Sequence, residues 1–236
     1  MARVEPRPED TTREHLLNVA EALFLERGPD EVSLRMIVRE SGQKNQSALQ
    51  YYFGSRDGLI DAILDRRLEQ IDARRGALVE MALAGDPDPE LRQICALMIR
   101  APFLLCREDR SFRDFLGLMG QRLLASDQDL NTADDAEREP NLMHMRALLR
   151  GKLRHVDPEV LKLRIENAYA FTVLAISRRA RRRESFRGRQ AELFFDNLAD
   201  QLAAMLGAAV SDATRAQLEG HGQARELEGV ASSGGR

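Results

Sequence analysis

Apolar residues recur every three to four positions along most of the chain, which is the pattern of amphipathic α-helices. The first stripe of apolar residues covers positions 16–24. The helix that carries it is predicted to end at Gly28, which a proline follows. Thr11 and Glu14 have the spacing of a capping box, so we expect this helix to begin at about Thr11. Residues 1–10 contain two prolines and no periodicity, and they predict a flexible arm.

Three further helices are predicted next, each bounded by a capping or breaking residue. Ser33 is a suitable N-cap for a short helix that ends at residues 41–42. A second short helix is centred on residues 47–53, and Ser55 can cap a long helix over about residues 56–83.

The rest of the chain is also predicted to be helical, in longer pieces. These helices cover residues 89–107, 112–125, 140–155, 158 through at least 176, and 190–207. The acidic stretch 126–139 has little apolar content and predicts a solvated loop, and the end of the chain from Gly220 predicts a disordered tail. No segment alternates in the manner of a strand, so the fold class is predicted to be all-α.

Composition narrows the class of protein. The 236 residues are 43% hydrophobic and 31% charged, which is enough to bury a core and excludes a disordered or collagen-like chain. The net charge of −3 gives no global positive field, so any nucleic-acid-binding surface must be local.

Two further features bear on the compartment. Cys95 and Cys106 fall on one predicted helix, where about 1.5 Å of rise per residue would hold them roughly 16 Å apart, too far for a disulfide. The N-terminus has no apolar stretch behind its arginines, and no apolar run approaches the roughly 18 residues that cross a bilayer. We therefore expect a cytoplasmic protein with no membrane partner.

Residues 33–53 have the pattern of a helix-turn-helix, in which a short amphipathic helix, a tight turn at Gly42 and a second short helix follow one another. Leu49 and Phe53 lie one turn apart and are predicted to be buried. The opposite face then carries side chains that can reach base edges and phosphates, namely Gln46, Ser47, Gln50 and Tyr51. Four basic and two acidic residues between 33 and 57 give a local charge of +2. The alternative is three short helices of an ordinary bundle with a polar face.

Two motifs flank this pattern: Phe24-Leu25-Glu26-Arg27-Gly28 precedes it, and Tyr51-Tyr52-Phe53-Gly54-Ser55-Arg56-Asp57-Gly58-Leu59 closes it. With them, residues 11–65 resemble the N-terminal DNA-binding domain of the tetracycline-repressor (TetR) family, which has an F-x-x-x-G pattern and a Y-x-F-x-S-[KR]-[DE]-x-L signature. The resemblance covers the first quarter of the chain. It implies a DNA-binding transcriptional regulator, a repressor that a small-molecule inducer releases from a palindromic operator.

The same resemblance implies a division of the chain. A three-helix helix-turn-helix head would occupy residues 11–56, after the arm at 1–10. A larger helical bundle for regulation and dimerisation would occupy residues 57–219, before the tail at 220–236.

Carried over residue by residue, the resemblance makes residues 46–52 the recognition helix. The implied DNA contacts are Lys44, Asn45, Gln46, Ser47, Gln50, Tyr51 and Tyr52, with Arg56 as a phosphate contact. The chain departs from the commonest pattern in two ways: one extra residue separates Gly42 from Phe53, and Tyr52 stands where a histidine is frequent.

The implied body binds an inducer and dimerises. Its apolar pocket candidates are Met98, Phe103, Phe112, Phe115, Met119, Met143, Met145 and Tyr169, for which ordinary core packing is the alternative. An anionic inducer could use Arg100, Arg113, Arg122 or Arg146. The homodimer is expected to form through the last two long helices, with apolar rows made of Ile165, Tyr169, Leu174, Leu193, Phe194, Leu198, Leu202 and Leu206.

Other patterns point to no chemistry. The arginine-rich run 178–183 has the composition of a nucleic-acid patch, but its place at a helix C-terminus favours a structural or interface role, which includes pairing with the acidic loop. Catalytic motifs and metal-ligand spacings are absent from the sequence, so we expect no catalytic residue, metal or cofactor. An all-helical enzyme or an acyl-carrier-type binding bundle is the competing class. Salt-dependent duplex binding that requires Gln50 and Tyr51 would separate the two.

Overall fold

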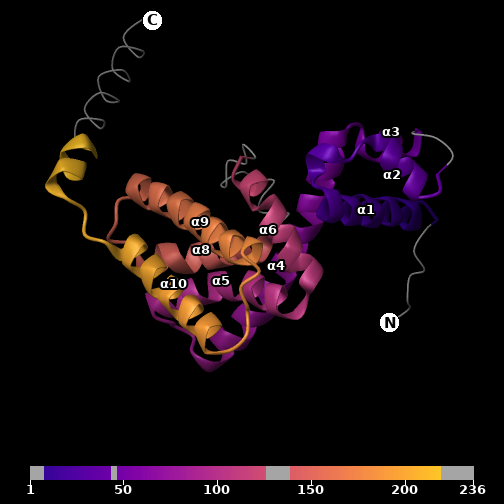
Figure 1. Ribbon diagram of the computed structural model, residues 1–236. Coiled ribbons are helices and arrows are strands. Elements are labelled where there is room, and N and C mark those ends of the chain that lie inside the picture. The colour runs from indigo at the N-terminus through magenta and orange to yellow at the C-terminus, as the bar shows by residue number, and fades with distance from the viewer. Residues whose placement is uncertain (1–7, 44–46, 126–138, 219–236) are drawn as a thin grey trace, which may run out of the picture.

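The computed structural model describes residues 8–43, 47–125 and 139–218, and the regular structure of these ranges is helical without strands. Figure 1 shows a small head at one side and a larger body at the other. The head contains α1 (Pro8–Arg27), η1 (Pro29–Glu31), α2 (Leu34–Glu40) and α3 (Ser47–Phe53). The body contains α5 (Leu91–Glu108), α6 (Arg110–Ala125), α8 (Pro140–Lys152), α9 (Pro158–Arg181) and α10 (Arg189–Gly207). The 30-residue α4 (Arg56–Gly85) runs from the head into the body. The predicted all-α class is confirmed.

Several predicted helix boundaries are wrong by two or three residues, and three of them are informative. Helix α1 begins at Pro8 and not at Thr11, because the first turn of a helix has no intrahelical partner for its N–H groups and therefore accepts proline. Helix α5 begins after Glu90 and not at Pro89, since Glu90 and Gln93 form a reciprocal capping box. Helix α8 ends at Lys152, three residues before the expected end. The predicted loop at 126–138 and the tail from residue 220 lie outside the described residues.

Capping side chains start several helices where the sequence predicts them. The Ser33 hydroxyl accepts a hydrogen bond from the amide of Met36 at 3.3 Å, and the Ser55 hydroxyl accepts one from the amide of Gly58 at 3.0 Å. The carboxylate of Asp157 accepts from the amide of Glu159 at 2.8 Å, with Pro158 as the first residue of α9. Each cap satisfies an N–H group that the helix itself leaves unpaired.

The head closes over an apolar core that α4 completes. Leu16, Leu17 and Phe24 of α1 are buried together with Leu59 and Ile60 of α4. The first turns of α4 therefore belong structurally to the head, although the expected division of the chain assigned the body from residue 57. One helix thus takes part in both cores.

In the body, α6 packs along α9, and α5 packs along α10. Two glycines allow the close approach of α6 to α9. A Cβ on Gly117 would lie 3.1 Å from the backbone nitrogen of Arg181, and a Cβ on Gly120 would overlap the hydroxyl of Ser177. The contact between these two helices therefore depends on the absence of side chains at both positions.

Candidate nucleic-acid interface

The turn of the helix-turn-helix is built on Gly42. This residue has a φ of 69°, a left-handed conformation that glycine adopts without steric cost. The amide of Gly42 donates to the carbonyl of Arg39, and the amide of Gln43 donates to the carbonyl of Val38. This pair of hydrogen bonds is a Schellman motif, which ends α2 and turns the chain toward α3.

Helix α3 has one buried and one exposed face. Leu49 is 3% exposed and Phe53 is 9% exposed, and both pack in the core of the head. On the other face, Ser47 and Gln50 are exposed, and Tyr51 is 76% exposed. This face therefore offers an amide, a hydroxyl and a phenol to the solvent, which are groups that can hydrogen-bond to base edges and phosphates.

The remaining predicted contacts fall in different places. Tyr52 is half-buried and its ring meets that of Tyr51 edge to face, with centroids 5.0 Å apart. Lys44, Asn45 and Gln46 lie outside the described residues. The described part of the recognition surface therefore begins at Ser47.

Arg56 makes several contacts inside the head. Its Nε donates to the carbonyl of Val32 at 3.3 Å, a terminal nitrogen donates to the carbonyl of Pro29, and its guanidinium lies 6.0 Å from the ring centroid of Phe24. Arg56 thereby fastens the segment between α1 and α2 to the start of α4. Its expected phosphate contact remains a prediction. The exposed Arg35 and Arg39 of α2, counted in the local charge but not among the expected contacts, are additional basic groups on the head.

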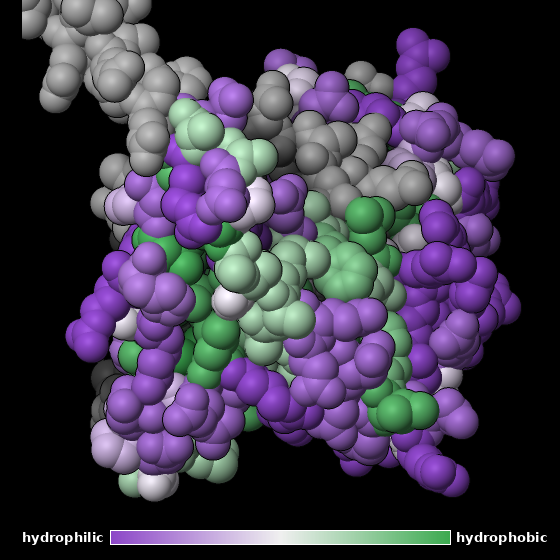
Figure 2. All heavy atoms as spheres, turned by 90° about the vertical axis from the view of Figure 1, so that its left-hand side faces the viewer, coloured by the Kyte–Doolittle hydropathy of each residue, from purple (hydrophilic) through white to green (hydrophobic). Residues whose placement is uncertain are grey.

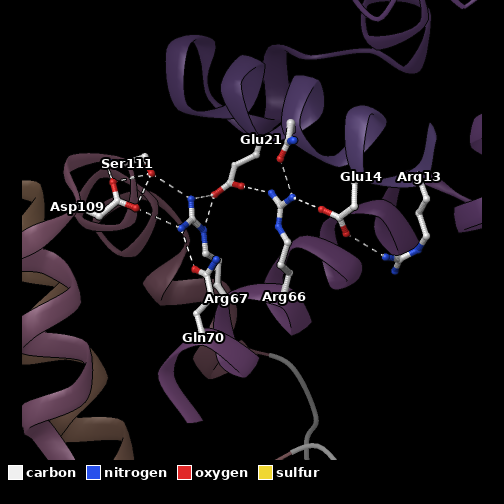
Figure 3. Close-up of polar contacts among 9 residues, drawn as sticks. Arg13, Glu14, Glu21, Arg66, Arg67, Gln70, Asp109 and Ser111 are labelled. Carbon is white, nitrogen blue, oxygen red and sulfur yellow. Dashed lines mark hydrogen bonds and ion pairs between the residues drawn. The ribbon is translucent and has the colours of Figure 1, made fainter. Parts of the chain in front are cut away.

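A buried network of charges connects the head to the body (Figure 3). Its centre is Glu21 of α1, which is 6% exposed and faces two consecutive arginines of α4. Arg67 donates from Nε to Glu21 at 2.7 Å, and Arg66 donates to the other carboxylate oxygen. Arg66 also contacts Asn18 at 2.7 Å and Glu14 at 3.2 Å. No local motif in the sequence marks this network, because Glu21 lies 45 and 46 residues from the two arginines along the chain.

On the body side, Arg67 is held by the start of α6. Its guanidinium donates to the hydroxyl of Ser111 at 3.2 Å and lies 5.4 Å and 5.5 Å from the ring centroids of Phe112 and Phe115. Burial by itself raises the pKa of the neighbouring Asp109 carboxyl, but hydrogen bonds from Ser111 and the amide of Phe112, together with the charge of Arg67, outweigh burial and lower the pKa. Arg67 therefore contacts α1 and α6 at the same time.

The body encloses a small cavity between α4, α5, α6, α8 and α9. Its volume is about 60 Å³, and its lining is Leu68, Ile71, Arg75, Met98, Pro102, Leu116, Glu139, Leu142, Tyr169, Thr172, Val173, Ile176 and Ser177. Ligand pockets usually enclose about 300 Å³ or more. The cavity is therefore nearly closed in this state. A separate open groove of about 490 Å³ lies between α8 and α9.

The predicted pocket residues divide between this cavity and the core. Met98 and Tyr169 line the cavity. Phe103 packs against Phe186 and Phe195, whereas Phe112 and Phe115 lie beneath Arg67. Met145 is buried in the core, and Met143 is half-buried near Arg146, 4.0 Å from a guanidinium nitrogen. The side chain of Met119 lies outside the described residues.

A compact ionic cluster forms one wall of the cavity. Arg75 donates to Asp72 at 2.7 Å and contacts Glu139 at 3.4 Å. Asp72 also accepts from the backbone amides of Asn141 and Leu142, at 3.1 and 2.9 Å, and so caps α8. Burial raises the pKa of the Glu139 carboxyl against the attraction of Arg75.

The proposed anionic contacts in the body differ in availability. Arg100 stacks on Phe195, with 4.3 Å between the guanidinium carbon and the ring centroid, and Arg146 is only 2% exposed. Arg113 is half-buried. The side chain of Arg122 lies outside the described residues.

The predicted apolar rows of the last two helices are wrong in part. Ile165, Leu198, Leu202 and Leu206 are buried in the core of the protomer. Leu174 and Leu193 of the predicted rows are exposed, by 49% and 59%, and so is Leu163, which the rows did not include, by 55%. Tyr169 and Phe194 are half-buried. At the end of the body away from the head, hydrophobic side chains also gather across the middle of the surface, with hydrophilic ones around them (Figure 2).

The arginine-rich run contains one residue with clear structural contacts. Arg179 is buried, donates to the carbonyl of Ser185 and to Glu184, and stacks on Phe186 and Phe194. It secures the turn between α9 and α10, which agrees with the structural interpretation of the run. The acidic loop lies outside the described residues, except for Glu139.

Neither metal nor membrane sites are evident in the part of the chain that the structure describes. No group of three or more His, Cys, Asp or Glu side chains there is placed to hold a metal ion. In the same ranges, no helix is long and apolar enough to cross a membrane. Cys95 and Cys106 are both buried and unbridged on α5.

Comparison with known proteins agrees with this geometry. The family described as "Bacterial regulatory proteins, tetR family" matches residues 16–63. The chain is similar to the structure of a tetR family transcription regulator from Shewanella sp. PV-4, with a TM-score of 0.56 and 16% identity over 81% of this chain and 95% of that one. A tetR-family transcriptional regulator from Streptomyces coelicolor gives a TM-score of 0.51 and 21% identity over 87% and 86%. No curated protein sequence matches the chain.

Residues 16–63 therefore match the helix-turn-helix family of tetR bacterial regulatory proteins, and the chain as a whole has the fold of TetR-family transcriptional regulators. The resemblance carried by the motifs at 24–28 and 51–59 is confirmed.

Proposed function

We propose that this protein is a transcriptional repressor that binds a palindromic operator as a homodimer and releases it when a small molecule binds the body. The observation that carries the DNA-binding part is the polar outer face of α3. Leu49 and Phe53 anchor this helix in the core, while Gln50 and Tyr51 are exposed on it. A short helix fixed in this way can enter a major groove without unfolding the head.

The side chains on α3 are assigned different tasks. Gln50 and Tyr51 read base edges, while Ser47 and Tyr52 contact the backbone or neighbouring bases. Lys44, Asn45 and Gln46 extend this surface at the start of the recognition helix, and Arg56 contacts phosphate. Contacts to bases supply sequence discrimination, whereas contacts to phosphates supply affinity that salt weakens.

The test uses an operator selected from random duplexes with the purified full-length chain, followed by fluorescence anisotropy at several salt concentrations. We expect Gln50→Ala to reduce discrimination at particular bases by about 1–3 kcal/mol, and Arg56→Ala to weaken all duplexes and lower the salt slope by about one. Gln201→Ala, on the exposed surface of α10, is the control. Equal losses on every duplex with unchanged salt slopes would refute these roles.

A dimer is required because one recognition helix reads too few base pairs. Two-fold symmetry places two such helices about 34 Å apart, one turn of DNA. The exposed Leu163, Leu174 and Leu193 support an interface on α9 and α10, since each leaves apolar surface in water that association would cover. Leu174→Asp should yield a monomer in sedimentation equilibrium. The control is Met81→Asp, because Met81 is an apolar side chain on α4 that is 70% exposed but lies outside the proposed interface. This variant should leave the dimer intact.

In this proposal the small molecule that releases the operator binds in the cavity of the body, and α4 transmits its effect to the head. Leu68 and Ile71 of α4 line the cavity, and Arg67, on the same helix, contacts both α1 and α6. A ligand that prefers the DNA-incompetent state tenfold supplies about 1.4 kcal/mol against operator binding, and one with equal affinity for both states supplies nothing.

Metabolites made by the products of neighbouring genes are the first to screen for operator release. Once a releasing compound is found, Glu21→Met combined with Arg67→Met should retain operator binding but respond less to it. The double substitution removes the two buried charges together, and Arg66 keeps its ion pair with the exposed Glu14, so no buried charge is left without a partner. Enhanced operator binding on adding the compound would indicate an activator instead.

A further inference from the structure

Two buried polar groups on the wall of the cavity have no hydrogen-bond partner. They are the hydroxyl of Ser177 and the Nε of Arg75, in residues that are 8% and 6% exposed. Both residues line the cavity, from α9 and α4 respectively. Buried polar groups are nearly always paired, because desolvation without a partner is unfavourable. The Nε of Arg75 can only donate a hydrogen bond, and the hydroxyl of Ser177 can donate or accept, so an acceptor is the partner that would satisfy both groups.

Among the described residues, the charges that meet at this wall of the cavity balance. Asp72 and Glu139 contribute two negative charges there and Arg75 and Arg146 two positive ones, and Arg75 contacts both carboxylates, at 2.7 and 3.4 Å. The charge of Arg146 also acts on Glu139. A charged ligand would add an uncompensated charge to a buried site, which is costly, whereas a neutral ligand would not.

The rest of the lining offers apolar contact. Met98, Leu116 and Val173 are among the side chains that supply it. Thr172 also lines the cavity, but its hydroxyl already donates to the carbonyl of Ala168 at 2.8 Å. The unmet hydrogen-bonding capacity is therefore that of Ser177 and Arg75.

We propose that the cavity takes an uncharged, mainly hydrocarbon molecule that carries one hydrogen-bond-accepting oxygen, such as a ketone, and that Ser177 and Arg75 donate to this oxygen. This inference rests on the proposed function, since it names the chemistry of the inducer.

Binding must enlarge a cavity of about 60 Å³. Met98 is the side chain best suited to move, because methionine is unbranched and flexible. Leu116 forms the α6 side of the cavity, directly after Phe115, which packs against Arg67. Displacement of Leu116 therefore reaches the residue that joins α6 to α1.

The test compares four single-ring probes of similar size on the purified full-length protein, titrated by ligand-observed NMR. Acetophenone has a neutral acceptor oxygen, ethylbenzene has none, benzoate is an anion and benzylamine is a cation. We expect acetophenone to bind about tenfold more tightly than ethylbenzene, with both ions weaker than acetophenone. Tighter binding of benzoate or benzylamine, equal binding of ethylbenzene, or no binding of acetophenone would each overturn the inference.

Two variants make the assignment specific to one hydroxyl. Ser177→Ala should weaken acetophenone about tenfold and leave ethylbenzene unchanged. Thr172→Val is the matched control, because its hydroxyl is already bonded within α9, and it should leave both affinities unchanged. Removing an unpaired buried hydroxyl should not lower the thermal midpoint of the Ser177 variant, so a loss of acetophenone binding cannot be attributed to unfolding. Unchanged acetophenone affinity in the Ser177 variant contradicts the inference.

Operator binding by the same preparations separates this inference from the proposed function. If the protein binds its operator and acetophenone shows no preference over ethylbenzene, the inference about the ligand fails while DNA recognition by α3 stands. If no duplex is bound specifically, the proposed function itself fails.

Discussion

The head and the body are built from the same helical material, yet contacts of different range along the chain hold them. In the head, the contacts that define the helix-turn-helix are local: Ser33 and Ser55 cap helices within three residues, and Gly42 turns the chain by its own conformation. In the body, they join distant segments, as when Arg75 of α4 meets Glu139 before α8, 64 residues away. Local contacts leave a motif in the sequence, whereas distant ones do not.

Charged residues show the same difference. In the head, Arg35 and Arg39 are exposed. In the body and at its junction with the head, Arg67, Arg75 and Arg146 are buried. A buried guanidinium fixes the relative position of the elements it joins, since it must keep its partners. The comparison indicates that α2 of the head presents two arginines outward, whereas buried arginines connect the helices of the body and join them to the head.

The largest effect is expected at the junction of the two regions. Glu21→Gln removes the carboxylate that pairs with Arg66 and Arg67 and leaves buried charge uncompensated, so it should lower the free energy of unfolding by about 3–5 kcal/mol. Urea unfolding measures the loss. Glu108→Gln is the control, since its pair with Arg74 joins α4 to α5 on the surface and should cost less than about 1 kcal/mol. Similar losses in both variants would show that burial does not distinguish the two pairs.

The next effect tests close packing in the body. Gly120→Ala would place a Cβ against the hydroxyl of Ser177, so it should destabilise the protein by about 1–3 kcal/mol. Combination with Ser177→Gly should recover part of the loss in the same unfolding experiment, because the opposing side chain is removed. Gly85→Ala, with open space around it, should cost nothing. No recovery in the double variant would place the cause elsewhere.

A smaller effect is expected from a glycine in the head. Gly42→Ala meets no neighbour, but an alanine at a φ of 69° is strained and should cost about 1 kcal/mol. Gly151→Ala in α8 also meets no neighbour and should be neutral or stabilising. Thermal unfolding compares the two. Equal effects would mean that the turn does not require a left-handed residue.

The smallest expected effect is that the two cysteine thiols hardly react in the folded protein. Burial raises the pKa of both Cys95 and Cys106 to about 12, so at pH 8 only a minute fraction is thiolate. Both thiols lie in the body, on α5. A disulfide reagent at pH 8 should modify them slowly in the native protein and rapidly in urea, which makes them a reporter of opening in the body alone. Rapid modification of the folded protein contradicts this.

Most helices, and the design of the head, could be predicted from the sequence because their causes lie within a few residues. The Ser33 and Ser55 caps, the turn at Gly42 and the burial of Leu49 and Phe53 agree with the prediction. The start of α5 was misplaced for an equally local reason, since the capping pair of Glu90 and Gln93 competed with Pro89. Contacts of α3 with DNA remain predictions from the resemblance.

The body was predictable as helix but not as a packed structure. Hydrophobic periodicity shows that a helix has an apolar face, but not whether that face meets its own chain or a second copy. Leu198 and Leu202 therefore seemed available for a dimer, yet they complete the core of the protomer, while Leu163 and Leu193 are exposed. Similarly, Phe112 and Phe115 have the composition of a pocket but support Arg67.

By itself, then, the sequence determined the all-α class, the helix-turn-helix and its family, because capping, turn conformation and periodicity are properties of neighbouring residues. Only the tertiary structure decided which side of each body helix is buried, which charges meet across the head and body, and where a cavity remains. Those outcomes depend on contacts between residues far apart in the chain, such as Glu21 with Arg67 and Arg75 with Glu139. The physical reason is that packing selects among faces that the sequence makes equally apolar.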